Sequence, residues 1–219
     1  MPHIDLKNDF PGMRSLVAYS PETAAPMSAM TEILLRSKDG LQPGERELIG
    51  MYVSYLNDCF YCHHSHGEIA CIYLGGDREL VEQVRKDYTT AAISEKLKSL
   101  LAIAAKVQRG GKFVTEADVV NAKANGADDK DIHDTVLIAA AFCMFNRYVD
   151  GLATTTPTDL STYPLRAKQV AEKGYGDHII KDKQPARAQY NSFRKLITMP
   201  KHNPLIKSIT IKTIKSNAS

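Results

Sequence analysis

The sequence predicts an all-α bundle, and three observations support that prediction. Residues that start and stop helices recur along the chain, apolar residues repeat at helical spacing, and the alternation typical of strands is scarce. Of the 219 residues, 43% are hydrophobic and 24% are charged. This ordinary composition can bury a core, so it excludes a wholly disordered or fibrous chain.

The first half of the chain divides into four predicted helices. Each starts at a capping residue or a proline, and glycines or an Asn-Asp pair separate them. The expected helices cover residues 20–40, 43–56 and 59–75, and a fourth starts at Asp77. Asp58 is expected to cap the helix that begins at Cys59.

Two long helices, over residues 94–110 and 128–148, are predicted in the second half, with a short one between them over residues 115–126. The first of them has the clearest apolar stripe, formed by Leu97, Leu100, Leu101, Ala104 and Ala105. The short one opens with a capping box that uses aspartate in place of the usual glutamate. A shorter helix is expected over residues 165–172.

The composition changes after Gly151, where a threonine-rich segment resembles a linker. We therefore expect a helical domain over residues 1–157 and an irregular extension over residues 158–219, packed on the body or on a neighbouring subunit. From Lys181 onward nine Lys or Arg residues face one acidic residue, whereas the first 180 residues hold 19 basic and 24 acidic residues. The isoleucines of residues 206–214 should be covered by a partner subunit.

The sequence favours a cytoplasmic protein with no membrane partner. Its first residues lack the basic and apolar stretches of a secretory signal. The most apolar run, Val136 to Phe145, is far shorter than the ~20 residues of a membrane span. Nucleic-acid binding is disfavoured, because the basic tail has few aromatic residues and no Gly/Arg repeats.

Residues 47–66 carry the most informative pattern, since a C-x-x-C pair (Cys59 and Cys62) is followed by His66 and preceded by Glu47. In a helix that starts at Cys59, the two thiols and His66 share one stripe, with His63 beside it. The positive end of a helix stabilises a thiolate, which is the nucleophile in reactions with peroxides. An imidazole can relay the thiol proton, and Glu47 or Glu45 can complete the relay.

The combined pattern E-x11-C-x-x-C-x-x-x-H resembles the AhpD-like alkylhydroperoxidases of the carboxymuconolactone decarboxylase superfamily. The resemblance extends roughly from Thr31 to Ala153 and includes the segment 142–147. It implies an AhpD-like helical bundle that assembles as a homo-oligomer, a trimer or a hexamer, with the active site near a subunit contact. Some members carry a histidine between the two cysteines, where this chain has Phe60 and Tyr61.

By this resemblance the chain is a peroxidase that reduces hydroperoxides. Cys62 is the peroxidatic thiol, Cys59 the resolving thiol, and Glu47 with His66 the proton-relay pair. The partners are a hydroperoxide substrate and a dithiol reductant, either a protein or a small molecule. No cofactor or metal is needed for this cycle. Tyr52, Tyr55, Phe60 and Tyr61 suggest an apolar wall, which favours organic hydroperoxides.

Other interpretations of the same residues remain open. The cysteines could be buried structural thiols, or zinc ligands together with His63 or His66. The disulfide could serve a non-catalytic redox sensor or assembly protein, and a decarboxylase-type reaction would not need the cysteines. His63 and His64 are expected at the surface or a subunit contact.

The remaining candidates lie outside the motif. Cys71 and Cys143 are expected in the core, and Asn146 and Arg147 either line the site or serve as capping and salt-bridge residues.

Overall fold

The structure is a computed structural model of the chain, and it describes residues 1–176. Within those residues it contains nine α-helices, two short 3-10 helices (Gly111–Phe113 and Leu160–Thr162) and no strand, which confirms the predicted all-α class. The α-helices are α1 (Met13–Tyr19), α2 (Pro21–Arg36), α3 (Pro43–Leu56), α4 (Phe60–Tyr73), α5 (Arg78–Asp87), α6 (Glu95–Arg109), α7 (Glu116–Ala124), α8 (Asp129–Gly151) and α9 (Tyr163–Lys173).

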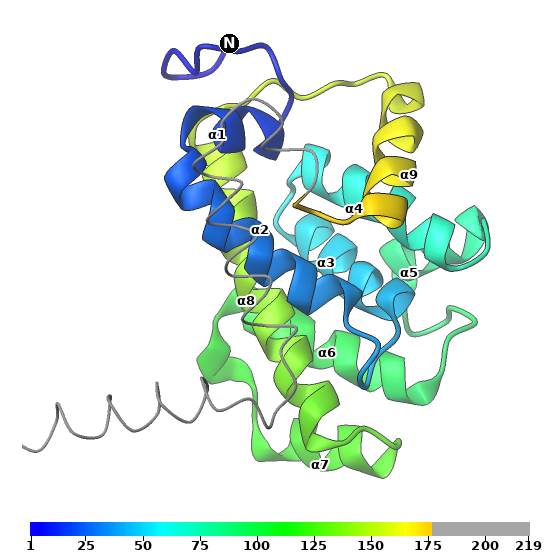
Figure 1. Cartoon of the computed structure of the whole chain (residues 1–219). Coiled ribbons are helices and arrows are strands. Elements are labelled where there is room, and N and C mark those ends of the chain that lie inside the picture. The colour runs from blue at the N-terminus through cyan, green and yellow to red at the C-terminus, as the bar shows by residue number, and fades with distance from the viewer. Residues whose placement is uncertain (177–219) are drawn as a thin grey trace, which may run out of the picture.

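Helices α3, α4, α6 and α8 form the centre of the bundle (Figure 1). α3 packs against the other three, while α1 and α2 lie along α8 and α9 lies against α4. The main core draws its buried apolar residues from α3, α6 and α8, among them Leu48, Leu100 and Ile138. Across the described residues no helix is long and apolar enough to cross a membrane.

The crossing of α3 and α8 depends on Gly50. A Cβ atom at this glycine would lie 2.3 Å from the Phe142 ring, so only glycine lets the two helices approach this closely. α3 itself begins with Pro43 at its first position and a capping box between Gln42 and Glu45. These features fix the position of Glu47, one turn before Gly50.

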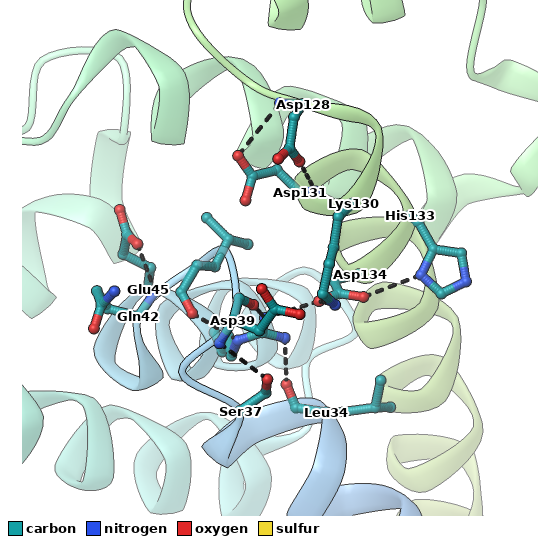
Figure 2. Close-up of polar contacts among 12 residues, drawn as sticks. Leu34, Ser37, Asp39, Gln42, Glu45, Asp128, Lys130, Asp131, His133 and Asp134 are labelled. Carbon is teal, nitrogen blue, oxygen red and sulfur yellow. Dashed lines mark hydrogen bonds and ion pairs between the residues drawn. The ribbon is translucent and has the colours of Figure 1, made fainter. Parts of the chain in front are cut away.

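A buried arginine joins three parts of the bundle. The guanidinium of Arg46 donates to the carbonyl oxygens of Leu34, Leu41 and Asp39 at 2.7–2.9 Å, and to Asp134 Oδ2 at 2.8 Å. Figure 2 shows Asp134 with Lys130 and His133 around it and with Leu34 and Asp39 facing the same point. The contacts tie the start of α3 to the end of α2 and the first turns of α8.

We expect Arg46→Met to destabilise the protein by about 3 kcal/mol. Removing the guanidinium group leaves the buried Asp134 carboxylate without its ion-pair partner and three carbonyl oxygens without their donor. The low end of the usual range applies, since Lys130 and His133 still contact Asp134. Urea unfolding followed by circular dichroism measures the change. The exposed Arg147→Met is the control, expected within about 0.5 kcal/mol of wild type. Equal midpoints for the two variants would contradict this role of Arg46.

The helices differ from prediction at several places, for example at the end of α2, which is reached at Arg36 and not at residue 40. Asp58 does not cap α4: its φ of +57° puts it in a left-handed turn, and Cys59 is the N-cap residue instead. The predicted helix start is therefore one residue early. Helix α1 was not predicted, because Gly12 at its start and the short apolar run after it give no capping signal.

The last helix is longer than predicted, and α9 runs from Tyr163 to Lys173 with a proline in its first turn. It packs on α4, beside the predicted site. The basic residues from Lys181 onward and the isoleucines of 206–214 lie outside the described residues.

Candidate functional site

The two cysteines of the motif lie at the N-terminus of α4. Cys59 is the N-cap residue and is fully buried, and Cys62 lies in the first turn with 4% of its surface exposed. Backbone N–H groups at this end of a helix are unpaired and carry positive partial charge, which stabilises a thiolate. Both cysteines are free thiols. Cys62 lines a cavity and Cys59 does not, so a small molecule reaches Cys62 first.

The Cys59 thiol faces the Cys62 sulfur and the Asp150 carboxyl group. Its hydrogen bond to Cys62, together with burial, raises the pKa of Cys59 far above its ordinary value. Burial also raises the pKa of Asp150, and the hydrogen bond with Cys59 partly opposes that change. Cys59 therefore stays protonated beside Cys62.

Glu47 and His66 meet where α3 packs on α4. His66 Nδ1 donates to Glu47 Oε2 at 2.7 Å, and the Glu47 side chain is completely buried. The Phe142 ring packs edge-to-face on the imidazole, with ring centroids 4.6 Å apart. Holding Nδ1 on the carboxylate fixes the tautomer of the imidazole and leaves Nε2 on the side away from Glu47. His66 lines the same cavity as Cys62.

Tyr175 completes this cluster, and sequence analysis missed it. Its hydroxyl donates to Glu47 Oε1 at 2.6 Å and lies 3.4 Å from His66 Nδ1, and its ring stacks on the imidazole. Burial and the Glu47 carboxylate hold the pKa of the tyrosine well above its usual value, so it remains a donor. Glu47 thus accepts hydrogen bonds at both carboxylate oxygens.

The turn after α9 positions Tyr175. Gly174 has a φ of +83°, and a Cβ atom there would lie 2.3 Å from Glu32 Oε2. Glu32 accepts a hydrogen bond from the Tyr175 N–H at 2.8 Å and is itself paired with Arg36. The only sequence signal was Gly174 as a helix stop, and nothing in the pattern indicates that the next residue folds back onto α3 and α4.

The cavity has a volume of about 380 Å³, within the range of small-molecule sites. It lies between α1, α2, α4, α8 and α9. Its wall is mainly apolar and includes Val17, Met27, Ile69, Phe145 and Val170. Cys62, His66 and Tyr175 are among its polar residues, so the thiol predicted to react faces a mainly apolar space.

The predicted aromatic wall is only partly correct, since Tyr61 lines the cavity and Tyr52, Tyr55 and Phe60 do not. Tyr52 packs against Tyr88 with ring centroids 5.2 Å apart, and Tyr55 lies under Arg85. These two side chains of α3 point toward α5, on the face away from the cavity.

The two neighbouring histidines do not line the cavity either. His63 and His64 stack with centroids 4.0 Å apart, and Phe60 contacts both rings. Burial, with the nearby His64 and Arg85, lowers the pKa of His63 to about 4. His63 is therefore neutral near pH 7. Its ring is buried rather than at the surface.

The remaining candidates have structural contacts. Asn146 is buried and forms hydrogen bonds with the side chains of Ser54 and Asn57. Arg147 is exposed and donates a hydrogen bond to the Cys143 carbonyl oxygen. Cys71 belongs to the main core, and Cys143 packs against it, as predicted. Among residues 1–176 no group of three or more His, Cys, Asp or Glu side chains could hold a metal ion.

Comparisons with known proteins agree with this architecture. The model of the carboxymuconolactone decarboxylase family matches residues 77–156, which follow the cysteine motif. No curated protein matches the chain. Solved structures are also similar to it, among them the two that follow. The first is an uncharacterized peroxidase-related protein from Silicibacter sp. TM1040, with 30% identity and a TM-score of 0.63, over 68% of this chain and 78% of that one.

The second is an uncharacterized peroxidase-related protein described as an alkylhydroperoxidase AhpD core, from Ralstonia eutropha JMP134. It has 29% identity and a TM-score of 0.63 over the same shares of the two chains. Fold, identity and family model therefore agree, and the chain belongs to the carboxymuconolactone decarboxylase family, among its AhpD-like, peroxidase-related members.

Proposed function

We propose that the protein is a thiol-dependent peroxidase that reduces organic hydroperoxides through a dithiol–disulfide cycle of Cys62 and Cys59. The observation that carries this proposal is the different exposure of the two thiols to the cavity. Cys62 faces an apolar cavity together with His66, whereas Cys59 is buried behind it and in contact with it. A peroxidatic and a resolving thiol require this arrangement.

In the first step the Cys62 thiolate attacks the outer oxygen of R–O–OH. An S–O bond forms and the O–O bond breaks, which yields the sulfenic acid of Cys62 and an alkoxide. His66, protonated by the Cys62 thiol, supplies the proton that turns the alkoxide into R–OH. Glu47 holds the imidazole through Nδ1 and stabilises its charged form during this exchange.

In the second step Cys59 attacks the sulfenic sulfur. A disulfide forms, and the hydroxyl group leaves as water with the Cys59 proton, which the Asp150 carboxyl group beside the thiol can relay to it. A dithiol then reduces the disulfide and restores both thiols. Each cycle transfers two electrons from the dithiol to one hydroperoxide, and the oxidation stops at the disulfide.

Turnover separates a peroxidase from a redox sensor. With excess cumene hydroperoxide and dithiothreitol, we expect each chain to consume many equivalents of peroxide, measured as peroxide remaining over time. Without dithiothreitol, consumption should stop at one equivalent with loss of two thiols. A stop at one equivalent in the presence of the reductant favours the sensor and overturns the proposal. Peroxide consumption no faster than that by free cysteine also overturns the proposal. The cysteine-independent lactone reaction would then be the next activity to test.

A further inference from the structure

The cavity beside Cys62 contains two arginines that have no acidic partner in the part of the chain that the structure describes. Arg14 of α1 and Arg166 of α9 both line it. Within residues 1–176 neither forms an ion pair, whereas four other arginines are paired with carboxylates, namely Arg36, Arg46, Arg78 and Arg85. The two other arginines without a carboxylate, Arg109 and Arg147, are exposed on the surface. Among the arginines of residues 1–176, unpaired guanidinium groups are therefore half-buried only in this cavity.

The two charges act on the same part of the cavity. Burial lowers the pKa of Arg166, and the charge of Arg14 lowers it further. Both guanidinium groups also oppose the increase that burial causes in the pKa of Tyr61, which lines the same cavity. Arg14 additionally lies over the Phe10 ring at 4.7 Å. Two like charges near an apolar space are costly unless an anion joins them.

The rest of the wall is suited to an alkyl chain. Met13, Val17, Met27, Ile69 and Val170 line the same cavity as the two arginines. A ligand that matches every part of this lining has an apolar body against the wall, an anionic head group at the two guanidinium groups and a reactive end at Cys62. A carboxylate is the head that matches a guanidinium group with two parallel hydrogen bonds.

We infer that the substrate is a hydroperoxide that carries a free carboxylate, bound by Arg14 and Arg166 while its hydroperoxide group reaches Cys62. This inference rests on the proposed function for its reaction, and it names the substrate class. The chemistry is unchanged: the thiol pair gives two electrons, the O–O bond breaks, the hydroperoxy acid becomes a hydroxy acid and water, and a dithiol restores the thiols. The carboxylate takes no part in the redox step.

A matched pair of substrates tests the head group. We expect the ω-hydroperoxide of octanoic acid to react with a kcat/KM about ten- to a hundredfold above that of its methyl ester, as charge-assisted hydrogen bonds would provide. In the double variant Arg14→Gln/Arg166→Gln this ratio should fall to about one. The surface control Arg109→Gln/Arg147→Gln should keep the wild-type ratio. Equal rates for acid and ester in the wild type overturn the inference and leave the peroxidase intact.

Binding without chemistry separates the two proposals. Calorimetric titration of the reduced protein with octanoate should give saturable binding that methyl octanoate lacks and that the double variant Arg14→Gln/Arg166→Gln loses. If neither hydroperoxide is consumed but octanoate binds in this way, the peroxidase proposal fails and the carboxylate site stands. If methyl octanoate binds as well as octanoate, the carboxylate site fails.

Discussion

Replacing Cys62 by serine should reduce peroxide consumption to the rate of the protein-free reaction, whereas replacing Cys59 should leave one reaction per chain. The thiolate is the nucleophile, and a serine hydroxyl at this position stays protonated and does not cleave the O–O bond. Cys62 is the thiol that lines the cavity, and Cys59 does not, so Cys59 cannot replace it as the nucleophile. Cys59→Ser keeps that thiol and removes only the group that closes the disulfide.

Intact mass and free-thiol titration distinguish the two variants after one equivalent of cumene hydroperoxide. Cys59→Ser should gain one oxygen as a sulfenic acid, and it should be over-oxidised by further peroxide. Cys62→Ser should gain none. Cys71→Ser is the matched control, because Cys71 is also buried on α4 but lies in the main core. A Cys59→Ser protein without the added oxygen, or a Cys62→Ser protein that retains turnover, would contradict the assignment of the two thiols.

Most of the fold could be predicted from the sequence because its helices carry local signals. Ser94 and Asp128 accept the hydrogen bonds of N-caps, and Thr115 forms a capping box with Asp118, as the sequence indicated. Helix α1 lacks such a signal and was missed. The contact between Glu47 and His66 follows from neighbouring helices that pack on each other, so a motif on consecutive helices could indicate it.

The rest of the site is formed by contacts between distant segments. Tyr175 lies more than a hundred residues after Glu47 in the sequence, and its position depends on the turn at Gly174. Arg14 and Arg166 come from the first and last described α-helices. The aromatic wall was wrong for Tyr52 and Tyr55 because residue type does not indicate which neighbour covers each face of α3. Packing of α5 decides that.

Glu47→Gln should slow the reaction of Cys62 with hydroperoxide by about a hundred- to a thousandfold, as expected when the orienting partner of a general acid–base group loses its charge. The amide keeps the size of the side chain, but it no longer stabilises a charged imidazole at Nδ1, 2.7 Å away. The measurement is the rate of thiol loss in single turnover. Glu79→Gln, an exposed change on α5, is the control and should react as wild type.

Tyr175→Phe tests the same carboxylate from its other oxygen. Tyr175 is a positioning residue whose hydroxyl donates a 2.6 Å hydrogen bond to Glu47 Oε1. Without this bond the carboxylate is held less firmly against His66, so the single-turnover rate should fall. The effect on the rate at neutral pH should be smaller than that of Glu47→Gln, since the contact between His66 and Glu47 Oε2 remains. A Tyr175→Phe protein as fast as wild type would mean that Tyr175 only packs against the imidazole, and a Glu47→Gln protein as fast as wild type would remove Glu47 from the relay.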